Sequence, residues 1–483
     1  MPLNKLHTFR ALGIAITLFA TWSLATSPNA RAEGLEACRL VEASGPRRLY
    51  PNDLFSAFPA LSYNLPTSGT FRFAVIPIHF ADVPPDETPL GRVRQDMSTF
   101  VEYFKVQSYG KVTFQLQTLE TSVLLPGLSG QYEKARSTTD TQFAQLALTA
   151  ADPIFDFTGI HSVIFVLPKN QRFIKESLQG FAHSSDPVQL TTNEGRVRNY
   201  FLAGNYFDEV GNTTWSYWAH EVMHAFSLPD LYAQPWSSAA RDNLRKGWPI
   251  QGQGGGPMHG WDLMASQDGP SRSITLWTKW IRGWLDESQV RCIAPGQLGT
   301  IQLDLLPIEQ AGSGIRALMI PFSTSRALVI ESRRETAFNL ANDVVDDGVF
   351  VYEIDTSYGH GQMPLMPIKT QTLIRVNNST RLEPYFDALM DVNEVLKYET
   401  VSIRYDAKGL SDSITVSVGP LSPAQATTTT TSTTTTVQST TTTLAPRAAA
   451  VLQQRIVCQR GAATRVVRGP NPKCPAGFKR RKG

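Results

Sequence analysis

Apolar positions along this chain follow two different periods, which predict strands in some regions and helices in others. Nearly continuous apolar runs at 73–80 and 161–167 are typical of buried strands. Helical spacing of the apolar residues over 93–106 and 139–151 predicts two further elements, both helices. Helices mixed with buried strands predict an α/β (α+β) fold for this half of the chain.

The pattern changes in the second half of the chain, where short alternating segments such as 327–331 and 349–354 predict an all-β domain. The stretch 422–446 is mostly threonine and cannot form a core, so we expect a disordered linker there. We expect these boundaries along the chain: segments at 1–32 and 33–70, a mixed α/β domain at 71–286, a β-rich domain at 287–421, a Thr-rich linker at 422–446 and a Cys-containing tail at 447–483.

The segment 215–226 contains neither Gly nor Pro, so it predicts a helix, and Pro229 ends it. His220 and His224 are four residues apart and therefore lie on the same face of this helix. Two neutral imidazoles placed in this way can bind one Zn²⁺ ion at about 2.0–2.1 Å each. The alternative is an amphipathic core helix with two hydrogen-bonded histidines.

Glu221 follows the first histidine and is not needed as a ligand. A carboxylate in this position can take the proton of a metal-bound water, as the His-Glu-x-x-His mechanism requires. The chain turns after Ser227, which can return Asp230 toward the two histidines as a third ligand. We therefore expect a zinc site made by His220, His224 and Asp230, with Glu221 as the general base.

These residues resemble the metzincin pattern, which reads His-Glu-x-x-His-x-x-Gly-x-x-His/Asp and is followed by a methionine turn. Trp-Asp-Leu-Met at 261–264 resembles that turn, with Met264 below the metal. The likeness implies a metzincin-like catalytic domain with a twisted mixed sheet, in which an edge strand borders the substrate cleft and pairs with an extended substrate. The run 200–206 is the candidate for the strand next to that cleft, although the pattern alone does not identify the edge strand.

More narrowly, the chain resembles the M6 family of secreted metallopeptidases, of the immune inhibitor A type. Leu-Pro-Asp at 228–230 and Ser-Tyr-Gly-Lys at 108–111 resemble the motifs of that family, as do Lys279 and Gly-Trp at 283–284. The likeness covers roughly residues 71–420. It implies a zinc metalloendopeptidase that hydrolyses protein or peptide substrates.

Two departures from the pattern bear on the site. Ser227 stands where the clan usually has Gly, and a non-Gly residue with positive φ costs about 1 kcal/mol or more. Some metzincins have a tyrosine just after the methionine turn that can steady the oxyanion. No tyrosine directly follows Met264, so the residue for that role is open. Tyr232 and His259 are nearby candidates in the sequence. The alternative is that Tyr232 is a packed side chain and His259 a surface one.

Two rival interpretations stay open. In the first, a downstream glutamate such as Glu331 supplies the third ligand, as in a gluzincin-like site. In the second, the protein is a non-catalytic cell-surface-binding protein that retains a zinc site. An intact Glu221 argues against the second rival, and structural zinc sites usually fill all four positions with protein ligands.

The N-terminus indicates export. Two basic residues precede an apolar run at 11–25, and Ala-Arg-Ala at 30–32 offers a cleavage site, so we expect a secreted protein. Four cysteines fit an exported chain. Cys458 and Cys474 lie in one short tail and are expected to pair, which leaves Cys38 with Cys292. In the alternative, Cys38 is a thiolate that plugs the zinc.

Charge is distributed unevenly. Residues 447–483 carry ten Lys and Arg and no Asp or Glu, and the signal peptide carries three more basic residues. The rest of the chain then has 32 basic and 42 acidic residues. The tail is either an attachment to an anionic cell envelope or a solubilising end, and we expect no specific nucleic-acid partner. Asp346 and Asp347 could bind Ca²⁺, or form a solvated turn.

Overall fold

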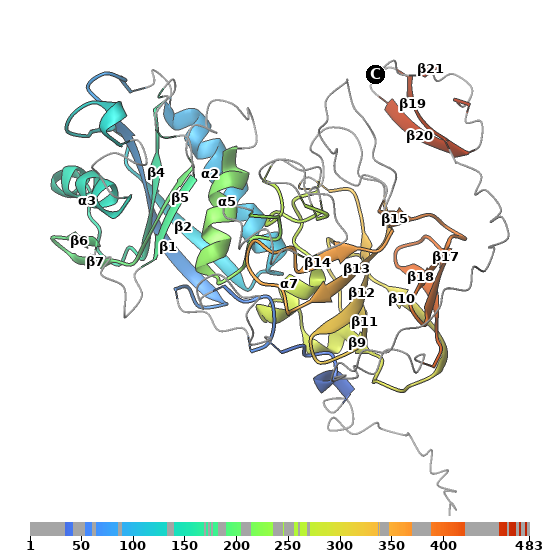
Figure 1. Cartoon of the computed structure of the whole chain (residues 1–483). Coiled ribbons are helices and arrows are strands. Elements are labelled where there is room, and N and C mark those ends of the chain that lie inside the picture. The colour runs from blue at the N-terminus through green and yellow to red at the C-terminus, as the bar shows by residue number, and fades with distance from the viewer. Residues whose placement is uncertain are drawn as a thin grey trace, which may run out of the picture. The chain divides into compact units, whose positions relative to one another are not determined.

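Figure 1 shows the computed structural model of the chain, which divides into two compact units, residues 1–422 and 423–483. The expected signal peptide and the Thr-rich linker lie outside the described residues. The structure describes residues 34–41, 54–59, 64–85, 89–132, 140–168, 171, 174, 177–181, 190–203, 214–234, 245, 256–258, 261–267, 271–336, 338, 347–369, 388–420, 454–460, 463–469, 473–474 and 479–480.

A mixed sheet forms the first half of the larger unit, with strand order β2-β1-β4-β8-β5. The pairs β1–β2, β1–β4 and β4–β8 are parallel, whereas β5 pairs antiparallel with β8. Strand β3 (Val123–Leu124) pairs with the end of β1, and β6 (Leu190–Thr192) forms a hairpin with β7 (Gly195–Val197). The main strands are β1 (Gly69–His79), β2 (Val112–Thr118), β4 (Ser162–Val166), β5 (Ser177–Phe181) and β8 (Asn199–Ala203).

Helices cover both faces of this sheet. Figure 1 shows α2 (Pro89–Gln107) and α5 (Thr214–Ala225) on one side and α3 (Asp140–Ala151) on the other. A hydrophobic core lies on each face of the sheet, and alternate residues of β1 point into one or the other. Phe73 packs in the core that contains α2 and α5, and Ile76 packs in the core that contains α3. A strand buried on both faces reads as a continuous apolar run, which is why 73–80 lacks alternation.

The second half of the larger unit contains two packed sheets. One has the strand order β14-β13-β12-β11-β9, with β15 also on β13, and the other is antiparallel with the order β10-β18-β17-β16. The strands are β9 (Val290–Cys292), β10 (Gly299–Leu305), β11 (Ala317–Pro321), β12 (Arg326–Arg333), β13 (Gly348–Asp355), β14 (Leu365–Pro367), β15 (Leu389–Met390), β16 (Val395–Tyr398), β17 (Val401–Ala407) and β18 (Asp412–Val418).

The first of these two sheets is buried on both faces, and this joins the two halves of the unit. Val351 of β13 packs between the two β-sheets, whereas Tyr352 belongs to the core that also contains α2 and α5. Helix α7 (Leu276–Ile281) lies in the same shared core. The boundary expected at 286/287 therefore falls inside one compact unit with a continuous core.

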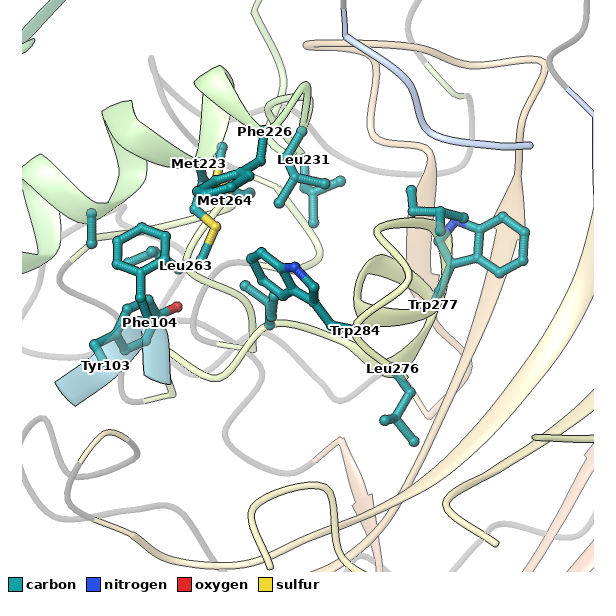
Figure 2. Close-up of a cluster of buried hydrophobic side chains, with 14 of the residues drawn as sticks. Tyr103, Phe104, Met223, Phe226, Leu231, Leu263, Met264, Leu276, Trp277 and Trp284 are labelled. Atoms are coloured by element: carbon teal, nitrogen blue, oxygen red, sulfur yellow. The ribbon is translucent and has the colours of Figure 1, made fainter. Parts of the chain in front are cut away.

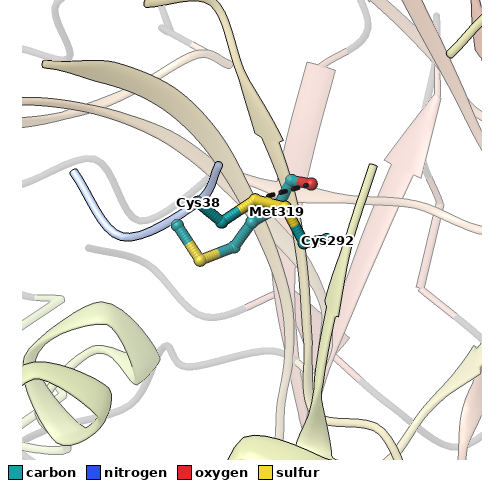
Figure 3. Close-up of a disulfide and its surroundings, with 3 residues drawn as sticks. All are labelled: Cys38, Cys292 and Met319. Atoms are coloured by element: carbon teal, nitrogen blue, oxygen red, sulfur yellow. Dashed lines mark hydrogen bonds between the residues drawn. A yellow bond between two sulfur atoms is a disulfide. The ribbon is translucent and has the colours of Figure 1, made fainter. Parts of the chain in front are cut away.

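A disulfide ties the N-terminal segment to β9, as expected. Cys38 and Cys292 are joined across a sequence separation of 254, and the carbonyl of Met319 lies 3.6 Å from the Cys38 sulfur (Figure 3). The N-terminal segment continues along the end of α5, where the N–H groups of Phe55 and Leu65 donate to the carbonyls of residues 227 and 225. The alternative of a zinc-plugging thiolate at Cys38 does not fit this disulfide.

The smaller unit contains a three-stranded antiparallel sheet of order β20-β19-β21, made by β19 (Gln454–Arg460), β20 (Ala463–Gly469) and β21 (Lys479–Arg480). Cys474 in this unit is disulfide-bonded. Within the described part of the chain, no helix has the length and apolar character needed to cross a membrane.

Most of the elements predicted from the sequence are present. The helices expected at 93–106, 139–151 and 215–226 are α2, α3 and α5 with shifts of a few residues at their ends, and 327–331 and 349–354 lie in β12 and β13. The run at 200–206 forms β8 up to Ala203, but β8 lies inside the sheet. The edge position belongs to β5, which the sequence pattern did not reveal.

Candidate metal centre

Helix α5 presents His220 and His224 together, because residues four apart share one face. Their rings meet edge to face, with centroids 5.0 Å apart, and both side chains are buried. Trp218 and Val222 of the helix are buried in the continuous core, and the helix lies against β8, β5 and α2.

The helix ends in a Schellman turn at Ser227. The N–H of Leu228 donates to the carbonyl of Met223 at 3.2 Å, and the N–H of Ser227 donates to the carbonyl of His224 at 2.8 Å. Ser227 has a φ of 63°, which is the left-handed conformation that glycine adopts at little cost. The serine thus adopts the conformation that glycine usually supplies at such a helix end, and the chain reverses toward the histidines.

The reversal places Asp230 against both imidazoles. Its Oδ1 lies 3.0 Å from Nε2 of His220 and 3.3 Å from Nε2 of His224, and all three side chains are buried. Ligands bound tetrahedrally at 2.0–2.1 Å lie about 3.3 Å from one another. The two distances from Oδ1 are thus close to that separation, and the three ligand atoms, which lie within 4.8 Å of one another, form a group able to hold a metal.

Backbone carbonyls select the tautomer of both histidines. Nδ1 of His220 lies 3.0 Å from the carbonyl of Leu263, and Nδ1 of His224 lies 2.7 Å from the carbonyl of Leu228. A carbonyl only accepts, so Nδ1 carries the proton and Nε2 presents its lone pair to the metal position. This is the outer arrangement that metal-binding histidines usually have.

The segment 261–264, where the sequence predicts a methionine turn, lies beside the candidate ligands. The carboxylate of Asp262 accepts the N–H groups of Met264 and Thr275, both at 2.8 Å, and this fixes the turn. The carbonyl of Met264 accepts the N–H of Leu231 at 2.9 Å. Figure 2 shows Met264 beside Met223 and Leu263 in the buried cluster. Burial raises the pKa of Asp262 to about 6, although its two N–H donors oppose that rise.

Glu221 is buried next to the three candidate ligands. Burial raises its pKa, and the charges of His220 and His224 oppose that rise. A carboxylate whose proton affinity is increased in this way is better matched to proton transfer near neutral pH than an exposed one.

The electrostatics of the site favour a cation. Burial alone would lower the pKa of His224, but the carboxylate of Asp230 raises it to about 9. Burial would raise the pKa of Asp230, but the charge of His224 holds it well below its usual range. In the metal-free protein a proton on His224 therefore balances the buried aspartate, and a bound metal ion would replace that proton.

The two candidates for an oxyanion contact differ in outcome. Tyr232 is half-buried and its ring stacks near His220, with centroids 6.3 Å apart. Burial raises the pKa of its phenol well above the usual value, so the hydroxyl keeps its proton. His259 lies outside the described residues.

Two residues at the site were missed by the sequence reasoning. His360 accepts the N–H of Asp230 on Nδ1 at 3.0 Å, and Gln234 donates to Oδ2 of the same aspartate. Burial lowers the pKa of His360 to about 4, so its ring is neutral. His360 follows a β-strand 130 residues beyond Asp230, and no motif spacing connects the two.

The rival third ligand lies elsewhere. Glu331 forms an ion pair with Arg333 at 2.6 Å, and it accepts hydrogen bonds from the N–H of Leu276 at 2.8 Å and the hydroxyl of Tyr352 at 3.1 Å. Glu331 is not in the metal-binding group found among the described residues. At the calcium candidate, Asp347 accepts from the backbone at residue 335 and pairs with a lysine at 3.0 Å, and Asp346 lies outside the described residues.

A scan of the chain against protein-family models and a search of curated proteins found no match.

Proposed function

We propose that this protein is a secreted zinc-dependent endopeptidase of the metzincin type, related to the M6 immune inhibitor A-like metallopeptidases. The observation that carries the proposal is the convergence of three buried ligand atoms, from His220, His224 and Asp230, beside Glu221 on the same helix.

The surrounding fold supports the metzincin interpretation. A zinc helix lies on one face of a mixed sheet whose last strand, β5, runs antiparallel to the others. Among the strands that the structure describes, β5 pairs only with β8, so its outer edge can accept an extended peptide through main-chain hydrogen bonds. Such an edge gives a protease affinity for many sequences, because the peptide backbone is common to all of them.

The chemistry follows from the roles of the named residues. When bound, zinc would acidify a water molecule and polarise the peptide carbonyl. His220, His224 and Asp230 hold the ion and leave a position for water, because they are three ligands and zinc takes four. Glu221 accepts the proton of the water and delivers it to the leaving amine.

The test compares the mature protein with Glu221→Gln and with Glu120→Gln, an exposed control outside the site. Cleavage of an unfolded protein and bound zinc are measured for each. We expect equal zinc in all three, and a loss of about 10²- to 10⁴-fold in rate for Glu221→Gln alone. Zinc without activity in the wild type would contradict an endopeptidase, and absence of zinc would contradict the metal site.

A second candidate function arises from the tail. Its ten basic residues and no acidic ones would attach the protein to an anionic cell envelope, whether or not the larger unit is an enzyme. A non-catalytic surface-binding protein with a zinc site is therefore the alternative. Binding of the full chain to envelopes, with no cleavage of any unfolded protein, would favour this alternative.

A further inference from the structure

Asp230 is held by a loop from the distant β-rich half of the chain, residues 356–364, which connects β13 to β14. Nδ1 of His360 accepts the N–H of Asp230 at 3.0 Å, and the N–H of Gly361 donates to the carbonyl of Asp230 at 3.0 Å. The carbonyl of Gly361 in turn accepts the N–H of Gln234 at 2.9 Å. Both backbone polar groups of the candidate ligand are thus bonded to the 356–364 loop.

The 356–364 loop is itself anchored on the protein. Its Thr356 hydroxyl donates to the carbonyl of Val41 at 2.7 Å, and its Tyr358 carbonyl accepts the hydroxyl of Ser56 at 3.2 Å. Gly361 has a φ of 68°, and a Cβ there would lie 2.7–2.9 Å from atoms of Gln234. Only glycine therefore allows the loop to approach the ligand segment so closely.

The donors around the carboxylate select one oxygen for the metal. Because Nδ1 of His360 accepts a hydrogen bond, its neutral ring carries the proton on Nε2, which lies 3.5 Å from Oδ2 of Asp230. Gln234 also donates to Oδ2. Oδ2 therefore faces two donors, whereas Oδ1 faces the Nε2 atoms of His220 and His224.

We propose that His360 is a positioning residue that fixes Asp230 as a one-oxygen metal ligand, so that the β-rich half of the chain completes the metal centre. This inference rests on the proposed zinc site. A metal site typically loses about 10- to 100-fold in metal affinity when a residue that hydrogen-bonds to one of its ligands is removed. The 356–364 loop thus determines metal affinity without contacting the metal.

Three substitutions separate the contacts of His360. His360→Ala removes both the acceptor for the N–H of Asp230 and the donor that faces its Oδ2. His360→Asn places an amide oxygen where Nδ1 lies and so keeps an acceptor for the N–H of Asp230. His360→Gln places its amide where Nε2 lies and loses that acceptor. Since Gln234 still donates to Oδ2, we expect the Asn variant to bind metal nearly as the wild type does, and the Gln variant to resemble the Ala variant.

His161 supplies a matched control, because its Nδ1 accepts the N–H of Arg72 at 3.1 Å away from the candidate ligands. His161→Ala and His161→Asn therefore remove or keep the same kind of bond at a site without metal. Zn²⁺ affinity is measured in each full-length protein by competition with a chelator, and the absorption spectrum of added Co²⁺ reports the ligand geometry. Cleavage is then followed as a function of free zinc.

We expect His360→Ala to weaken Zn²⁺ binding by about 10- to 100-fold, to change the Co²⁺ spectrum, and to recover activity when zinc is raised. Neither His161 variant should change affinity. Unchanged affinity in His360→Ala, or equal affinity of the Asn and Gln variants, would overturn the proposal. If the Ala variant does not fold, the Asn and Gln comparison decides alone. A wild type that binds no metal refutes the proposed function instead.

Discussion

Ser227 offers a direct test of backbone strain in the turn that carries Asp230 back toward His220 and His224. It is the residue that follows the last turn of α5, with a φ of 63°, and the hydrogen bonds of the turn depend on that conformation. Its hydroxyl is buried and has no hydrogen-bond partner among the described residues. Ser227→Gly would remove both unfavourable features and keep the backbone in place.

The magnitude follows from these two features. A non-Gly residue in the left-handed region costs about 1–2 kcal/mol, and an unpaired buried hydroxyl costs about 1–3 kcal/mol. In the opposite direction, glycine lowers the free energy of unfolding by about 0.4–1 kcal/mol, because it increases the conformational freedom of the unfolded chain. Loss of packing by the removed atoms offsets a further part of the gain, so we expect Ser227→Gly to raise the free energy of unfolding by about 1–2 kcal/mol.

The assay is urea unfolding at neutral pH with a chelator present, so that metal binding does not contribute. Ser227→Ala is the informative companion, because it removes the hydroxyl and keeps the strain. We expect the order glycine, alanine, serine from most to least stable. Asn393, with a φ of 70°, is the control, because asparagine tolerates this conformation and Asn393→Gly should gain little. A Ser227→Ala protein as stable as Ser227→Gly would refute the strain argument.

Four further outcomes are expected. Zinc affinity should fall about tenfold from pH 8 to pH 7, because His224, with a metal-free pKa of about 9, then binds a competing proton; a titration at both pH values checks this, and equal affinities would contradict it. In chelator, the His224 contribution to stability should be fully present below pH 6.5 and lost as pH rises through 9, since its folded pKa is the higher one; melting temperature against pH measures it. Replacing both Cys38 and Cys292 with serine should cost about 4–5 kcal/mol, given the long loop that the disulfide closes; unchanged urea unfolding would argue against this. Truncation before Phe71 should abolish activity instead of releasing it, because the N–H groups of Phe55 and Leu65 bond to the end of α5; a more active truncated protein would show that the segment is inhibitory.

The sequence predicted what depends on local spacing. His220 and His224 share a face because a helix repeats every 3.6 residues. The reversal after Ser227 was expected because Pro229 ends the helix and only a few residues separate Ser227 from Asp230. The convergence of His220, His224 and Asp230 in the structure agrees with the expected ligand group. The disulfide between Cys38 and Cys292 was predicted because the tail holds the other two cysteines.

What the sequence did not predict depends on tertiary packing. His360 reaches Asp230 from the loop that follows β13, a strand buried on both faces, and no periodicity of the sequence reports such an approach. The edge position of β5 was missed for the same reason, since strand order is a property of the assembled sheet. The continuous core across residue 286 also depends on side chains far apart in the sequence.

The hydrogen bond between Asp230 and His360 has a consequence for biosynthesis. The two residues are 130 positions apart, and ribosomes add about 5–20 residues per second. Asp230, the candidate third ligand, thus emerges roughly 7–26 seconds before the histidine that is proposed to position it. During this interval the nascent chain would carry a weak metal site. A chain that stops before β13 would never acquire a strong one, so premature termination would produce fragments that bind zinc poorly.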